Sequence, residues 1–115
     1  MNKQDFQNLC NALTQQLSLP PITVELKNTQ RGRARTKTNK ITIPKFAIGF
    51  GKAFCVYYII HEVCHFLQRG HGSKFKLIET EILKSYDLIP IYSRAYAKKL
   101  YDLNNNLLWS RKGRK

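Results

Sequence analysis

The segment His61-Glu62-Val63-Cys64-His65 constrains this 115-residue chain more than any other feature. Residues in an α-helix advance by about 100° and about 1.5 Å each, so His61 and His65 would stand one turn apart on one face. Two imidazoles in that position can hold one metal ion. Glu62 would lie beside the pair, where its carboxylate reaches a water on the metal rather than the metal itself. The segment therefore predicts a Zn²⁺ site with His61 and His65 as ligands and Glu62 as the general base of a hydrolase.

A third ligand is expected shortly after this helix. Gly70 tolerates a left-handed turn and is predicted to end the helix, after which the chain can fold back and present His71. Glu79 and Glu81 follow on a later predicted helix, and either could replace His71 as ligand or accept a hydrogen bond from a ligand histidine. Three protein ligands would leave the fourth tetrahedral position for water, as a catalytic zinc requires.

The helix that carries the motif is predicted to span residues 53–69 and to have two distinct faces. Tyr58 falls one turn before the histidines and is expected beneath the metal site. The face opposite the histidines is apolar and is expected to pack on the core. Its members are Val56, Ile59, Ile60, Val63, Phe66 and Leu67.

The remaining patterns predict an α+β fold, with an N-terminal helix, a three-stranded mainly antiparallel sheet and one or two C-terminal helices. Helical spacing of apolar residues, alternation in short strands, and prolines that stop both kinds of element give the bounds. The expected elements are a helix over residues 3–17, strands over 22–27, 32–37 and 40–43, a loop over 44–52, a helix over 73–86 with Ser73 as its N-cap, and a last helix over 92–108.

Length and cysteine content limit the organisation and the compartment. The chain is too short for two domains, so residues 1–110 are expected to form one domain, followed by a basic tail over residues 111–115. Three widely spaced cysteines favour buried free thiols and a reducing compartment. We find neither a signal peptide nor an apolar run long enough for a membrane span. A cytoplasmic location without membrane contact is expected.

The net charge of +13 is concentrated in two blocks. Residues 31–52 hold seven basic groups and no acidic one, and residues 91–115 hold seven basic groups and one acidic one. A polyanion such as DNA would be attracted to these blocks in a salt-dependent way. Solvated basic loops are the alternative, because no motif that reads bases is visible.

The stretch from His61 to Phe75, HEVCHFLQRGHGSKF, resembles the SprT-like metallopeptidases, which include the Spartan proteases that act on DNA–protein crosslinks. The shared features are the H-E-x-x-H helix and a histidine inside a G-H-G-x-x-F segment. The resemblance implies a small zincin-like domain, one zinc ion held by His61, His65 and His71, and Glu62 as catalytic base. The YgjP-like or WLM-like hydrolases are nearly as similar, because they share the short spacing between the second and third histidines.

The function that these features favour is zinc-dependent hydrolysis of peptide bonds, in a protein or peptide substrate that is associated with nucleic acid. Tyr86, Tyr92 and Tyr96 are candidates for stabilising the oxyanion. The alternatives are a non-catalytic basic module that binds nucleic acid or supports assembly around a structural zinc, and hydrolysis of a substrate other than a peptide.

Overall fold

A computed structural model describes residues 1–88 of the chain. The predicted helix over 92–108, the basic tail and the second basic block therefore lie outside the described residues. The first element is the helix α1, Lys3–Gln16, close to its predicted bounds of 3–17. It begins with a capping box, in which the Asn2 side chain accepts from the Asp5 backbone N–H and the Asp5 side chain accepts from the Asn2 backbone N–H.

Three short strands form one sheet in the order β1–β3–β2. They are β1, Thr23–Lys27, β2, Arg33–Arg35, and β3, Lys40–Pro44. β3 is parallel to β1 and antiparallel to β2. All three predicted strands are present, but the sheet is mixed, so the prediction of a mainly antiparallel sheet is wrong.

Burial explains this strand order. In β3, Ile41 and Ile43 have no exposed surface, whereas Arg33 and Arg35 of β2 are exposed. The chain therefore crosses from β1 to the outer edge, forms the basic strand there, and returns through the centre as β3. Because β2 runs opposite to β1 and then turns directly into the antiparallel β3, β3 runs parallel to β1. Charged residues suit an edge strand, which has one side open to solvent.

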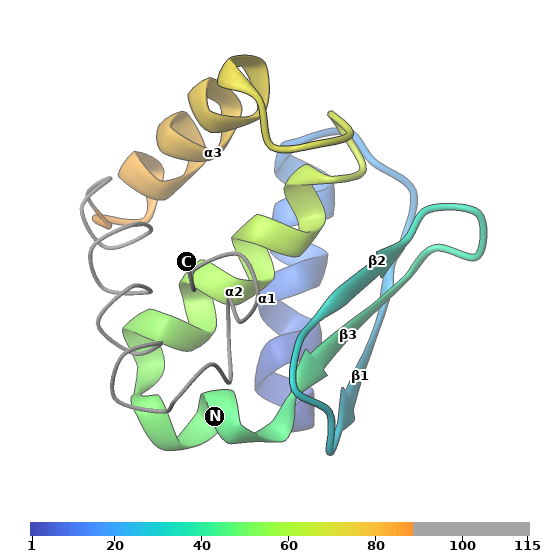
Figure 1. The fold of residues 1–115 in the computed structure, drawn as a ribbon, viewed down its shortest axis with the longest axis vertical. Coiled ribbons are helices and arrows are strands. Elements are labelled where there is room, and N and C mark those ends of the chain that lie inside the picture. Colours follow the sequence, from blue (N-terminus) through green and yellow to red (C-terminus); the bar gives the residue numbers. More distant parts are fainter. Residues whose placement is uncertain (89–115) are drawn as a thin grey trace, which may run out of the picture.

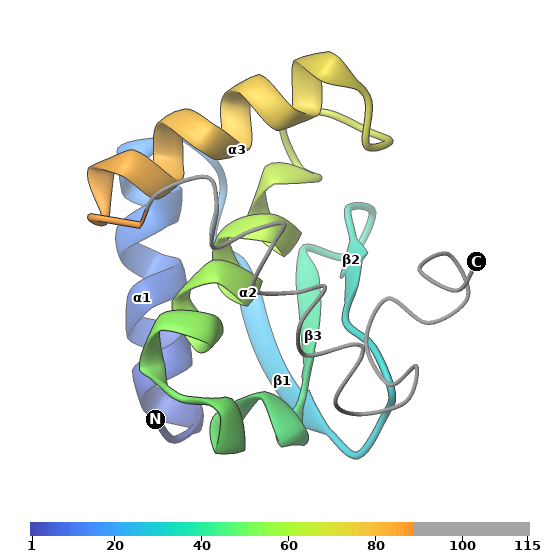
Figure 2. The same cartoon turned by 60° about the vertical axis from the view of Figure 1, so that its left-hand side comes forward.

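The helix α2, Lys52–Cys64, lies at the centre of the described structure and contacts α1, α3, β2 and β3. Figures 1 and 2 show it between the sheet and the two other helices. The predicted division into a core face and a metal face is too simple, since almost every residue from Phe54 to Cys64 is buried. α2 is a core helix on nearly all sides.

The prediction that this helix continues to residue 69 is wrong. Beyond Cys64 the backbone closes tighter turns, in which the N–H groups of Phe66 and Leu67 donate to the carbonyls three residues earlier. Leu67, predicted to face the core, is 37% exposed. This early end of the helix lets the following loop fold back and bring His71 against His61 and His65. Gly70 has φ +75° and supplies the predicted left-handed turn, but outside the helix.

Two further elements complete the described chain. The predicted loop over 44–52 contains a 3₁₀ helix, Lys45–Phe50, which leads into α2. The helix α3, Ser73–Ser85, follows the histidine-bearing loop. Its N-cap is Gly72 rather than the predicted Ser73, which is the first helical residue, and no side chain caps it.

The core is formed where α1, α2 and the inner face of the sheet meet. Cys10, Cys55 and Cys64 are free and buried within it, as predicted, and burial raises the pKa of the Cys64 thiol to about 12. Among the helices of residues 1–88, none is both long enough and apolar enough to cross a bilayer. The largest fully buried side chains are Tyr58, Phe6, Phe54, Phe75, Leu13, Ile22, Ile41, Ile43, Ile59, Ile60 and Leu83.

Candidate active site

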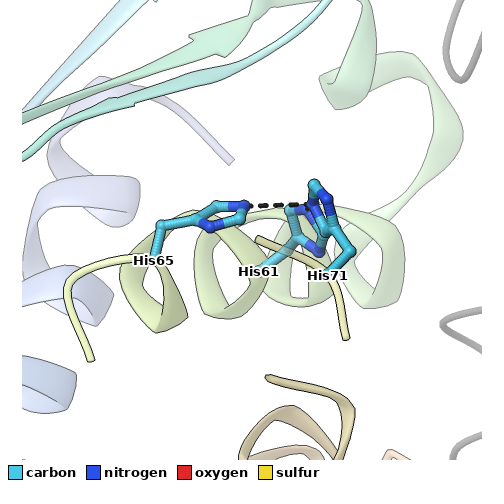
Figure 3. Close-up of side chains that lie close together, drawn as sticks. All are labelled: His61, His65 and His71. Atoms are coloured by element: carbon cyan, nitrogen blue, oxygen red, sulfur yellow. Dashed lines mark hydrogen bonds between the residues drawn. The ribbon is translucent and has the colours of Figure 1, made fainter. Parts of the chain in front are cut away.

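The three histidines of the chain converge at the C-terminal end of α2. His61 and His65 are one helical turn apart, as predicted, and the loop before α3 brings His71 against both. The Nε2 atom of His71 lies 3.1 Å from Nε2 of His65 and 3.2 Å from Nε2 of His61. Figure 3 shows the His71 ring beside that of His61, with His65 pointing toward the pair. The same nitrogen of each ring is therefore directed at a common point.

This arrangement fits a metal ion. Zinc–nitrogen bonds of about 2.0–2.1 Å in tetrahedral geometry place two ligand nitrogens about 3.3 Å apart. The Nε2 separations of 3.1 and 3.2 Å from His71 to the other two rings are close to that value, and all three ligand atoms lie within 4.8 Å of one another. A neutral imidazole can share only one proton with a neighbouring ring, whereas a cation satisfies three lone pairs at once. The donor set is the one that a catalytic zinc uses.

Glu79 of α3 orients His61 from behind. The Nδ1–H of His61 donates to Oε2 of Glu79 over 2.7 Å, and both residues are buried. A proton held on Nδ1 leaves the lone pair on Nε2, which is the tautomer that binds metal. Of the two roles left open for Glu79, the hydrogen bond to a histidine is the one observed. Glu81 instead lies in solvent and pairs with Lys84 at 3.8 Å.

Burial and the neighbouring rings hold His65 neutral. Its pKa is lowered to about 4, mainly by burial and further by its neighbours His61 and His71, while a hydrogen bond with the backbone of Gln68 opposes the shift. An imidazole with this pKa carries no charge at pH 7. Its lone pair is therefore available to a cation, and its partner histidines do not face a charged ring.

Phe75 is a site residue that sequence reasoning did not identify as one. Its ring packs against all three histidines, with centroids 5.2 Å from His61, 4.6 Å from His65 and 5.1 Å from His71. The signal was present in the sequence, because Phe75 and Glu79 are four residues apart and share a face of α3. One helix face therefore supplies both the apolar packing and the carboxylate that hold the rings.

Glu62 lies on α2 between the two helical histidines in sequence and is 6% exposed. Burial raises the pKa of its carboxyl to about 7, with His61 opposing the shift and Glu79 adding to it. A carboxylate with this pKa exchanges a proton readily at neutral pH. Glu62 and the three histidines line the same cleft.

Gly32, just before β2, connects the edge strand to α2. Its N–H donates to the hydroxyl of Tyr58 over 2.8 Å. A Cβ at this position would lie 2.5 Å from Cε1 of Tyr58 and 2.7 Å from Oε2 of Glu62. Tyr58 thus lies beneath the site, as expected, and burial together with the nearby Glu62 raises the pKa of its phenol. The backbone passes so close to Glu62 that only glycine fits.

The cleft has a volume of ≈ 1010 Å³, and its lining includes residues 29–36 and the three histidines. That volume is at the upper end of the range for small-molecule pockets and suits a segment of polypeptide. Tyr86 does not line it, and its hydroxyl donates to Gln16 of α1 at 3.5 Å. The other two tyrosines considered for the oxyanion, Tyr92 and Tyr96, lie outside the described residues.

The family comparison agrees with this site. The model of the YgjP-like metallopeptidase domain matches residues 2–87, well over half of the chain. This is the resemblance that the sequence placed second, and the preferred SprT-like assignment is not supported by it. Neither the curated proteins nor the solved structures give a significant match. By its matched length, its histidine cluster and its α+β fold, the chain belongs to the YgjP-like metallopeptidase family.

Proposed function

We propose that this protein is a zinc-dependent peptidase in which His61, His65 and His71 hold one Zn²⁺ and Glu62 is the general base. The observation that carries the proposal is the convergence of three Nε2 atoms, two of the separations being 3.1 and 3.2 Å, with His61 fixed in the required tautomer by Glu79. The family assignment supports metallopeptidase activity in general, and the position of the three histidines and Glu62 along one cleft supports the proposed ligands and base.

Zinc in this site would supply a Lewis acid and lower the pKa of a bound water to about 7. Glu62 accepts a proton as water attacks the scissile carbonyl and then gives that proton to the leaving amine. Its place in the cleft that the three histidines line suits both steps, because the carboxyl must take the proton from the water and pass it to the amine at the same centre. Burial of Glu62 also keeps bulk water from competing for the proton.

The edge strand β2 is the element best placed to hold the substrate backbone. Among residues 1–88, β2 pairs only with β3, so its outer edge has no strand partner. An extended peptide can add to such an edge through main-chain hydrogen bonds. Gly32 joins the start of this strand to Tyr58 directly over α2, which keeps the bound backbone near Glu62.

Contact with nucleic acid is a separate proposal that rests on charge. All seven basic residues within 31–52 are exposed. DNA bound through this block, or through residues 91–115, would dissociate as salt rises, because each neutralised phosphate releases counterions. Fluorescence anisotropy with duplex DNA at about 50 and about 200 mM salt tests this contact, and salt-independent or absent binding would reject it.

The test of the catalytic proposal separates metal binding from turnover. We expect the purified full chain to contain one zinc per molecule and to cleave casein. Glu62→Gln should retain the zinc and lose cleavage by at least about 10²-fold, because only proton transfer is removed. Glu81→Gln is the matched control, since Glu81 is exposed on α3 and lies outside the cleft.

Equal cleavage by Glu62→Gln and the native protein would reject Glu62 as the base. Retained zinc with no cleavage of any peptide by the native protein would favour the alternative, a structural zinc in a basic module that binds nucleic acid. The buried carboxylate of Glu62, in the same cleft as the three histidines, is the feature that favours catalysis over that alternative.

A further inference from the structure

The charge of the cleft walls is strongly one-sided. Five cationic residues line the cleft: Lys27, Arg31, Arg33, Arg35 and Arg69. Among residues 1–88, Glu62 is the only carboxylate that lines it. A bound divalent ion would add to this positive charge. Anionic groups would therefore be concentrated at the site, and cationic ones repelled.

Four of these cations are not neutralised by the described part of the protein. Lys27 pairs with Glu25 at 3.5 Å, but no ion pair within residues 1–88 involves any of the four cleft arginines. All four arginines are exposed. Arg69 belongs to the loop between His65 and His71, whereas the other three arginines lie in β2 or just before it. Two separate segments of the chain thus supply arginines to the cleft that the histidines line.

Arg33 and Arg35 are alternate residues of β2, so they could pair with alternate side chains of an extended peptide bound beside that strand. Ala34 is in register with the buried Ile41, so it faces the core, and the two arginines project together from the other face of β2. Residues two apart in a strand are about 7 Å apart on one face. A peptide strand added to the edge of β2 would place its own alternate side chains at the same spacing, opposite the arginines.

A polypeptide fits these features better than a nucleic acid. Single-stranded nucleic acids are held by aromatic rings on which the bases stack. Apart from the three histidines, the only aromatic residue that lines the cleft within residues 1–88 is Tyr58, and Tyr58 is 1% exposed. Within residues 1–88 the outer edge of β2 has no strand partner, and its backbone offers main-chain hydrogen bonds that a polypeptide can match and a phosphodiester chain cannot.

We propose that the cleft selects extended polypeptide segments with acidic side chains at alternating positions, which pair with Arg33 and Arg35 along the edge of β2. This inference names the substrate class of the site and rests on the proposed peptidase function. It extends that function, because the zinc ligands and Glu62 act on the peptide bond and do not discriminate between side chains.

The test measures binding and cleavage separately. Zinc-loaded Glu62→Gln full chain is titrated with synthetic Ala/Ser peptides that carry two Asp at i and i+2, two Asp at i and i+1, no charge, or two Lys. We expect the i, i+2 acidic peptide to bind about tenfold more tightly than the neutral one, and the Lys peptide to bind most weakly. The native protein should show the same order in kcat/KM, with the differences reduced at high salt.

Reversing the charge of Arg33 and Arg35 tests whether these two residues cause the preference for acidic peptides. In the double variant Arg33→Glu/Arg35→Glu, the ratio of acidic to basic peptide binding should invert. In Arg33→Gln/Arg35→Gln, which removes the charge without reversing it, the ratio should fall to a value between those of the native protein and the charge-reversed variant. The matched control is Lys74→Glu/Lys76→Glu, which changes the net charge equally at exposed positions of α3 outside the cleft and should leave the ratio unchanged. Circular dichroism checks that each variant is folded.

Several outcomes would overturn the inference. Equal binding of the acidic and neutral peptides, or of the two acidic arrangements, would do so while leaving the peptidase proposal intact. A single-stranded oligonucleotide that displaces the acidic peptide more effectively than another acidic peptide of equal charge would assign the cations to nucleic acid. Acid-selective binding without cleavage by the native protein would instead support this inference and reject the peptidase.

Discussion

Replacing Gly32 with alanine should damage both the fold and the site, because the space for one methyl group is already occupied. A Cβ at this position would lie 2.5 Å from Cε1 of Tyr58, 2.7 Å from Oε2 of Glu62 and 2.9 Å from the backbone oxygen of Thr42. None of these atoms can move cheaply. Tyr58 is 1% exposed, Glu62 is 6% exposed, and the third atom belongs to the central strand.

The magnitude follows from these contacts. Overpacking a filled interior costs about 1–3 kcal/mol, and weakening the hydrogen bond from Gly32 N–H to Tyr58 adds about 1 kcal/mol. A total near 3 kcal/mol would lower the melting temperature of a domain of about 100 residues by at least about 10 °C. Displacing Glu62 by about 1 Å should also reduce kcat/KM by about 10²-fold, since proton transfer depends on position.

Thermal unfolding followed by circular dichroism measures the first effect, and peptide cleavage by the zinc-loaded protein below its unfolding transition measures the second. Gly49→Ala is the control, because its φ is not positive and, among residues 1–88, no heavy atom beyond its chain neighbours lies within 4 Å of a Cβ there. We expect that control to be neutral or slightly stabilising. A Gly32→Ala protein with native stability and activity would refute the claim that the backbone at Gly32 lies too close to Tyr58 and Glu62 for a methyl group. Lost stability with native kcat/KM would refute only the effect on Glu62.

Two further predictions concern the carboxylates of the site. In the metal-free protein the pKa of Glu62 is about 7, above its usual 4.5, so the folded state binds the extra proton and stability falls as pH rises from about 4.5 to about 7. Metal-free Glu62→Gln should therefore gain up to about 3 kcal/mol over the native protein at pH 8 and nothing at pH 4, as measured by urea unfolding, and parallel pH profiles would contradict this. Glu79→Gln should weaken zinc affinity by about 10–100-fold in a chelator competition, because it loosens His61. Glu81→Gln, on the same helix, should leave the affinity unchanged.

The sequence predicted the local features of the site well. Helical periodicity alone places His61 and His65 one turn apart, and the glycine before His71 indicates that the chain turns back. The three rings converge as those local rules suggest. The roles of these residues as zinc ligands, and of Glu62 as base, stay predictions that the experiments above would decide.

The features that sequence reasoning got wrong depend on contacts between distant segments. Whether β3 is central or outer depends on the burial of Ile41 and Ile43 against the helices, which a strand pattern does not show. The length of α2 was overestimated because periodicity continues through Leu67, whereas the fold requires an early turn. The close approach of Gly32 to Glu62 joins residues thirty positions apart, and no local pattern indicates it.

The central position of α2 has a consequence for how such a protein could diverge. Its histidines and Glu62 stand on a helix that is also the middle of the hydrophobic core, so most replacements there would threaten folding before they could alter chemistry. The strand arginines and the loop around Arg69 are exposed and tolerate exchange. New substrate preferences would therefore arise by replacing the exposed residues that line the cleft, while the residues on α2 and the reaction they support stay the same.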